Sequence, residues 1–221
     1  MAEDRPTRVL VFTRTTGYRH ESIPAGVDAV RALAAEDGLA ADHTEDAGRF
    51  CPDDLAGYRT VVWLSASGDV LDADQRRAFG DWLAAGGTFA GVHGASTAER
   101  SWPDYETIVG ARFTHHPEIQ TAEIHVEDAD HPSTASLPPL WRHTDEWYDF
   151  EDNPRGRVHV LLTVDENTYD GGRMGTDHPL AWTTTYGSGR GWYTALGHSS
   201  EHYTDPTFLA HLRGGLRSLW S

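Results

Sequence analysis

The chain has 221 residues, a length that suits one sizeable α/β domain. Its net charge of −16 argues against a nucleic-acid partner, because binding to phosphates needs a basic surface. All 18 basic residues are arginine, and the lack of lysine excludes Schiff-base chemistry, lysine-anchored pyridoxal phosphate and a Walker-type phosphate loop. A single cysteine, Cys51, excludes an intramolecular disulfide and a thiolate metal cluster.

The sequence shows no membrane or secretion signal. No apolar run approaches the roughly 20 residues that a membrane-spanning helix needs. The first six residues, MAEDRP, lack the apolar stretch of a signal peptide. We therefore expect a cytoplasmic protein that does not bind membranes.

The first half of the chain alternates predicted strands and helices. Short β-branched and aromatic runs predict strands, apolar residues at helical spacing predict helices, and Gly38 and Gly86-Gly87 mark helix ends. The expected strands are Arg8–Thr13, Leu39–His43, Thr60–Leu64 and Thr88–Val92, and the expected helices are Ala25–Glu36 and Asp72–Ala85. This alternation predicts a parallel, doubly wound sheet with right-handed crossovers.

After about residue 115 the pattern becomes rich in strands. We expect strands at Ile119–Val126 and Val158–Val164, a hairpin formed by Leu180–Tyr186 and Gly191–Leu196, and a final amphipathic helix at Phe208–Leu219. No internal repeat, low-complexity tract or linker interrupts the chain. A single domain over residues 1–221 with a β-rich second half is the simplest interpretation.

The strand Thr88–Val92 ends in a tight turn that holds His93 next to Gly94. Ligands of open α/β sheets bind at the carboxyl ends of the strands, where this turn is expected. A sharp strand-to-helix turn is also how hydrolases present a nucleophile, but here the tip carries an imidazole. The alternative is an ordinary glycine turn with an incidental histidine.

The loop after the first predicted strand carries Arg19 and His20 at the same edge of the sheet. If the first and fourth strands are neighbours, this loop and the His93 turn would reach a common ligand. The alternative is a surface loop in which Glu21 and Ser22 only cap a helix, but this does not account for Arg19 and His20.

The segment His143–Tyr148 places Asp145 and Glu146 next to Trp147. Carboxylates and aromatic rings together are typical of sugar sites, since they bind hydroxyls and stack on the apolar face of the ring. An acidic residue among aromatics is also a candidate general acid. The segment therefore favours a carbohydrate as ligand.

Two later turns at strand boundaries carry Asp177 with His178, and His198. A metal site is a further hypothesis: the chain lacks a His-Glu-x-x-His motif, but His20, His93, His198 and Glu146 could converge from separate loops on a divalent ion such as zinc. The same groups could equally act as hydrogen-bond donors and a general base without a metal.

Six segments resemble the ThuA-like, trehalose-utilisation family. They are Thr15–Ile23 (TTGYRHESI), Gly91–Ala95 (GVHGA), His143–Phe150 (HTDEWYDF), Asp165–Gly172 (DENTYDGG), Met174–Trp182 (MGTDHPLAW) and Gly189–His198 (GRGWYTALGH). They occur in order over nearly the whole chain. The resemblance implies a class I glutamine amidotransferase-like fold, a flavodoxin-like architecture of three layers. In that superfamily the nucleophilic cysteine lies at the elbow where this chain has His93, so glutaminase chemistry is not expected.

The resemblance also implies the use of trehalose or a related disaccharide, through 3-keto-sugar intermediates. Carried onto this sequence, it places catalytic roles at His93, Glu146 and Asp145, and substrate binding at Arg19, His20, Trp147, Asp177, His178 and His198. Glu146 or Asp145 would act as acid or base, His93 would polarise a carbonyl or orient water, and Trp147 would stack on the sugar. Hydrolysis, elimination and isomerisation all stay open.

Two other classes of function are alternatives to a metal-free enzyme. A sugar-binding module would use the same aromatics and carboxylates without turnover, and a metal-dependent hydrolase would need zinc or manganese. The tryptophans Trp102, Trp141 and Trp220 could serve a homo-oligomer interface as easily as a sugar site.

Overall fold

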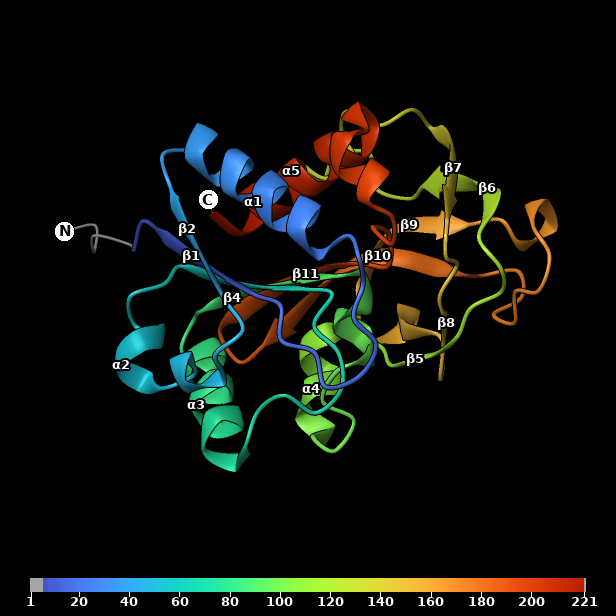
Figure 1. Cartoon of the computed structure of the whole chain (residues 1–221). Coiled ribbons are helices and arrows are strands. Elements are labelled where there is room, and N and C mark those ends of the chain that lie inside the picture. The colour runs from blue at the N-terminus through green and yellow to red at the C-terminus, as the bar shows by residue number, and fades with distance from the viewer. Residues whose placement is uncertain (1–5, 221) are drawn as a thin grey trace.

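The computed structural model describes residues 6–220 and contains a nine-stranded mixed sheet. The strand order is β2-β1-β3-β4-β11-β10-β9-β6-β7, in which β2 to β11 are parallel and the rest antiparallel (Figure 1). The parallel part follows the 2-1-3-4-5 order of flavodoxin-like sheets. The predicted α/β fold with a strand-rich second half is therefore confirmed. The N-terminal residues on which the absence of a signal peptide was argued lie largely outside the described part.

The parallel half contains the elements that the sequence pattern predicted, with shifts of one or two residues at their ends. They are β1 (Arg8–Phe12), α1 (Ile23–Glu36), β2 (Ala40–Thr44), β3 (Thr60–Leu64), α3 (Ala73–Ala84) and β4 (Thr88–Val92). The short helix α4 (Pro103–Val109) was not predicted, and like the short helix α2 (Pro52–Leu55) it begins at a proline. Proline suits the first helical turn because its missing N–H would have no partner there.

The second half extends the same sheet. It contains β6 (Gln120–Val126), β7 (Leu140–Asp145), β9 (His159–Val164), β10 (Pro179–Tyr186), β11 (Gly189–Thr194) and the closing helix α5 (Pro206–Trp220). A separate two-stranded ribbon joins β5 (Phe113–His115) to β8 (Asp149–Phe150). The sequence analysis missed β7 and this ribbon. Strand β11 inserts beside β4, so it links the antiparallel half to the parallel half.

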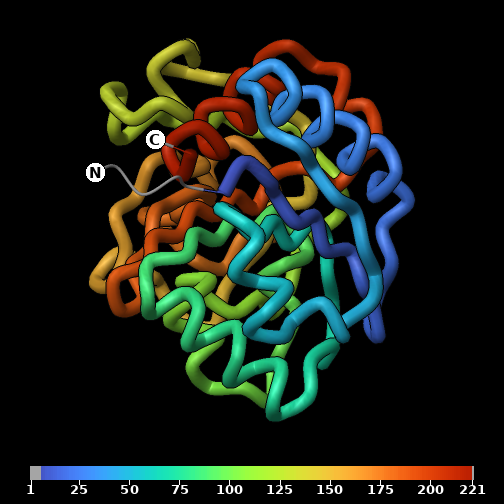
Figure 2. The backbone as a smooth tube through the Cα atoms, turned by 90° about the vertical axis from the view of Figure 1, so that its left-hand side faces the viewer, coloured from blue at the N-terminus to red at the C-terminus, as the bar shows by residue number. Residues whose placement is uncertain are grey.

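Helices cover both faces of the parallel half. Helices α1 and α5 lie on one face and α2, α3 and α4 on the other, and the view turned by 90° agrees for α1, α3 and α5 (Figures 1 and 2). All five residues of β3 and of β4 are buried, as expected for strands covered on both sides. No helix among residues 6–220 is long and apolar enough to cross a membrane.

The sheet topology sets where polar loops can meet. The carboxyl ends of β1, β3, β4 and β11 share one edge, because these four strands are parallel. The sequence analysis considered β1 and β4 as neighbours. This is not the case, because β3 lies between them. Their loops still meet, because the loops project beyond the sheet edge.

Helix α5 carries a buried imidazole that links it to the sheet. His211 Nδ1 lies 2.9 Å from the Ser133 carbonyl oxygen, and its Nε2 lies 3.0 Å from the Thr194 hydroxyl. Burial lowers the pKa of His211 to about 4, and the nearby His131 and His143 act in the same direction. The folded protein therefore holds His211 neutral under conditions in which the unfolded chain would protonate it.

This difference predicts a loss of stability in mild acid. The pKa of His211 is lower in the folded than in the unfolded state, so its contribution is complete above pH 6.5 and is lost as the pH falls toward 4. We expect the free energy of unfolding of the wild type to lose about 2 kcal/mol, relative to His211→Gln, between pH 7.5 and pH 5. Urea unfolding at the two pH values measures this, and a constant difference between the two proteins would contradict it.

Candidate active site

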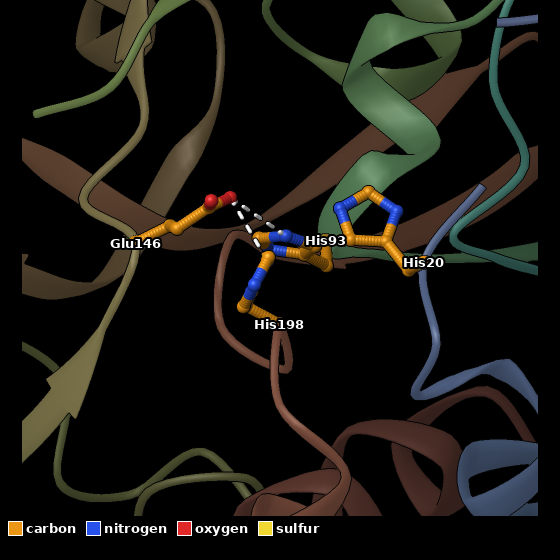
Figure 3. A group of neighbouring side chains, drawn as sticks. All are labelled: His20, His93, Glu146 and His198. Atoms are coloured by element: carbon orange, nitrogen blue, oxygen red, sulfur yellow. Dashed lines mark ion pairs between the residues drawn. The ribbon is translucent and has the colours of Figure 1, made fainter. Parts of the chain in front are cut away.

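Four side chains from four loops converge at the carboxyl edge of the sheet. His20 follows β1, His93 follows β4, Glu146 follows β7 and His198 follows β11 (Figure 3). The His20 ring centroid lies 4.6 Å from that of His93 and 5.3 Å from that of His198. Glu146 Oε2 lies 3.0 Å from His198 Nδ1 and 3.5 Å from His93 Nε2. We call these four residues the His-Glu cluster.

His93 lies at a strained elbow, as its glycine-bounded turn predicted. Its φ of +49° is in the left-handed region, which residues other than glycine rarely adopt. Gly94 is required by close approach, because a Cβ at this position would lie 3.1 Å from His20 Cε1 and 3.2 Å from Ser65 Cα. The turn therefore brings the His20 and His93 rings together.

Hydrogen bonds fix the orientation of the His93 ring. Its Nδ1 lies 2.6 Å from the Ala195 carbonyl oxygen, so Nδ1 carries the proton and donates it. Nε2 is then left with a lone pair in the neutral ring, and it accepts a hydrogen bond from the Tyr148 hydroxyl at 2.9 Å. His178 in turn contacts the main chain of Tyr148, since its Nε2 lies 2.9 Å from the Tyr148 carbonyl oxygen.

The surroundings of the His-Glu cluster favour a neutral His20 and an ionised Glu146. Burial lowers the pKa of His20 to about 3, helped by His93 and His198, so this imidazole is neutral. Burial acts to raise the pKa of Glu146, but His198 and His93 outweigh it and hold the pKa below its usual range. Interaction with Glu146 raises the pKa of His198. Glu146 is therefore an ionised carboxylate that faces three imidazoles.

Asp145 is completely buried behind the cluster and does not face the cavity. Its carboxylate accepts hydrogen bonds from the backbone N–H groups of Glu146 at 2.8 Å, Gly197 at 2.8 Å and His198 at 3.3 Å. Burial acts to raise its pKa, but His143 and His202 outweigh it and the net pKa is lowered. Asp145 is thus an ionised anchor that joins the ends of β7 and β11.

A cavity of about 510 Å³ opens in front of the cluster. Its polar wall includes His20, Glu146 and His116, and its aromatic wall consists of Tyr18, Phe113 and Tyr148. His116 Nε2 lies 3.5 Å from Glu146 Oε1, on the side of the carboxylate away from the cluster. The volume is within the range of about 300 to 1,000 Å³ typical of small-molecule sites.

Four other predicted site residues lie outside the cavity wall. Arg19 forms an exposed ion pair with Glu45 at 2.7 Å, and Asp177 forms one with Arg155 at 2.6 Å. Trp147 is fully buried with its Nε1 donating to the Gln120 carbonyl, and its ring does not line the cavity. His178 is also fully buried and contacts Tyr148 and Glu166 instead of the cavity.

Sequence reasoning gave no site role to four residues of the cavity wall, Tyr18, Phe113, His116 and Tyr148. Tyr18 is 66% exposed, next to His20, and its ring stands edge-on to that imidazole at 4.7 Å. Tyr148 lies two residues after Glu146, so the alternation of an extended segment could have suggested that both face one side. Phe113 and His116 carried no comparable signal, because only the tertiary fold brings β5 to this edge.

Comparison with known proteins confirms the resemblance noted from the motifs. The chain matches the ThuA family, described as trehalose utilisation, over residues 8–220. A ThuA-like protein from Bacteroides uniformis superposes with a TM-score of 0.82 at 23% identity, covering 98% of this chain and 92% of that one. One from Parabacteroides merdae superposes with a TM-score of 0.77 at 21% identity, with coverages of 97% and 90%. The comparison with curated proteins finds no match.

The buried carboxylate of Asp145 and the exposed carboxylate of Asp177 should contribute differently to stability. Asp145→Asn would leave three backbone donors facing an amide and remove a buried charge, so we expect a loss of about 2 to 4 kcal/mol in the free energy of unfolding. Asp177→Asn makes the same chemical change in an exposed ion pair and should cost less than about 1 kcal/mol. Urea unfolding followed by tryptophan fluorescence measures both, and equal losses would contradict the anchoring role of Asp145.

Proposed function

Because the chain belongs to the ThuA family, trehalose utilisation, we propose that it is an enzyme acting on a trehalose-type disaccharide or its 3-keto derivative. The observation that carries the proposal is the ionised carboxylate of Glu146 in the wall of a cavity that also presents aromatic rings. Carboxylates bind sugar hydroxyls, and aromatic rings pack against the apolar face of a sugar. The cavity supplies both within one small-molecule site.

The aromatic wall suits one sugar ring. Phe113 and Tyr148 pack together with ring centroids 4.3 Å apart, and Tyr148 also packs at 4.3 Å on His93. Tyr18 presents an exposed ring on the opposite loop. We assign to Tyr18 and Phe113 the stacking role that the motif comparison had given to Trp147.

The three reactions left open share one first step, the removal of a proton. In base-assisted hydrolysis the proton comes from water, and in elimination or isomerisation of a keto-sugar it comes from the carbon beside the carbonyl. Glu146 is placed to accept it, because its carboxylate is ionised and borders the cavity, while the histidines that hold its pKa below the usual range make it a weaker base than a free carboxylate. Tyr148 lines the same cavity, and its hydroxyl oxygen, whose proton is donated to His93 Nε2, could accept a hydrogen bond from a hydroxyl of the substrate.

Substrate contacts outside the cluster come from groups other than those first predicted. Ser67, Thr97 and Arg100 line the cavity, although Arg100 also pairs with Glu151, whereas Arg19 and Asp177 do not line it. We propose a free small carbohydrate as the partner, consistent with the strongly acidic chain. Cytoplasmic location and oligomeric state stay predictions.

Glutaminase chemistry is not part of this proposal. That reaction uses a cysteine at the elbow, and the elbow here carries His93. Cys51 precedes α2 and is not among the residues that line the cavity. The chemistry must therefore rest on imidazole, carboxylate and tyrosine groups.

The test is turnover of a sugar panel that contains trehalose, 3-ketotrehalose and related glucosides, followed by NMR. We expect the wild type to consume a keto-disaccharide, and Glu146→Gln to reduce kcat by at least about 100-fold, the usual contribution of a general base. Asp177→Asn is the matched control, because it makes the same carboxylate-to-amide change outside the cavity, and it should keep the wild-type rate.

Two outcomes would count against the enzyme. Binding of the sugar by both wild type and Glu146→Gln without turnover would show a sugar-binding module. Neither binding nor turnover over the whole panel would remove the carbohydrate proposal.

A further inference from the structure

We propose that His20, His93, His198 and Glu146 form a binding site for one divalent transition-metal ion of the zinc type. The proposal concerns metal binding itself and does not rest on the sugar reaction. It assigns a ligand role to each member of the His-Glu cluster. Hydrogen bonding alone does not explain why these four side chains converge.

The spacing of the cluster is close to that of a metal site. One ligand atom from each of the four residues lies within 4.8 Å of all the others. Glu146 Oε2 lies 3.0 Å from His198 Nδ1 and 3.5 Å from His93 Nε2. Ligand atoms held about 2.1 Å from a tetrahedral ion are about 3.4 Å apart. The two pairs with Glu146 lie close to this separation, and the remaining pairs, which lie within 4.8 Å, would have to move inward to complete the site.

Two of the imidazoles have buried nitrogens that lack hydrogen-bond partners among the described residues. They are Nδ1 of His20, a side chain only 4% exposed, and Nδ1 of His198. The His198 nitrogen forms an ion pair with Glu146 Oε2 at 3.0 Å. Buried polar atoms are nearly always paired, so the unpaired Nδ1 of His20 indicates a missing ligand.

The surroundings of His93 resemble the support of a metal-bound histidine. Such a ligand commonly donates its second ring N–H to a carbonyl or carboxylate, which fixes the ring and the tautomer. His93 Nδ1 donates to the Ala195 carbonyl at 2.6 Å, which directs Nε2 toward Glu146. The Tyr148 hydroxyl, 2.9 Å from Nε2, would have to give way to the ion.

The set of donors selects the class of ion. Three imidazoles and one carboxylate suit zinc and neighbouring first-row metals, whereas calcium and magnesium prefer sites built from oxygen. Glu146 Oε2 faces the imidazoles and Oε1 lies 3.5 Å from His116, so one oxygen can bind the ion while the other borders the cavity.

Two other groups of potential ligands are less suitable because backbone groups already occupy their carboxylates. In the group His143, Asp145 and His202, Asp145 accepts three backbone hydrogen bonds. In the group Asp149, Glu166 and His178, Glu166 accepts from the N–H groups of Met174 and Gly175. The His-Glu cluster has no such backbone donors to its carboxylate among the described residues.

The test measures metal binding directly on the full chain. The protein is stripped with a chelator and titrated with Zn²⁺ by calorimetry, and Co²⁺ loading is followed by its visible absorption, which reports four-coordinate geometry. We expect one ion per chain, and at least a tenfold weaker affinity in His20→Gln and in Glu146→Gln. Circular dichroism of each metal-free variant checks that it is folded.

Two matched histidine variants locate the ion. His116→Gln removes an imidazole from the cavity wall and His202→Gln removes one from the neighbouring group, and both should keep one tight ion per chain. The proposal is overturned if the wild type binds no ion stoichiometrically, or if His202→Gln loses the ion while His20→Gln and Glu146→Gln keep it. Turnover assayed with and without Zn²⁺ is scored separately, so failure of the sugar proposal leaves the binding result intact.

Discussion

The buried carboxylate of Asp145 is the constraint on which the site depends. It accepts hydrogen bonds from the backbone N–H groups of Glu146, Gly197 and His198, and so joins the end of β7 to the end of β11. These strands lie far apart in the sheet order. This anchor holds the backbone of Glu146 next to that of His198, and both residues are carried by loops. A buried charge satisfied by backbone donors is thus used here for positioning.

The parallel strands supply the other half of the site through strained turns. Among residues 6–220, the residues other than glycine with positive φ are Ser65, His93 and Glu99, and the first two directly follow β3 and β4. Unusual backbone conformations of this kind cost free energy and persist where surrounding packing holds them. Here the packing is dense, since a Cβ at Gly94 would press on both His20 and Ser65. The strained turn at His93 therefore places its imidazole against that of His20.

The site combines an ionised carboxylate with a neutral imidazole in a partly buried setting. Glu146 stays ionised because His198 and His93 outweigh the cost of its burial, and His20 stays neutral because burial dominates. A neutral imidazole is the form that binds metals, and an ionised carboxylate is the form that accepts protons. The proposed sugar chemistry depends on the ionised Glu146, and the proposed metal site depends on both Glu146 and the neutral His20. The cavity beside them has room for a small molecule.

The sequence by itself determined the succession of strands and helices along the parallel half of the chain and the elbow at His93, because these depend on local periodicity and glycine placement. It also carried the family motifs and named all four members of the His-Glu cluster. Only the tertiary structure separated Glu146, which borders the cavity, from its neighbour Asp145, which is buried as an anchor. It likewise buried Trp147 and brought Phe113 to the cavity. Adjacent residues on an extended segment face opposite sides, and which side meets solvent depends on packing between distant segments.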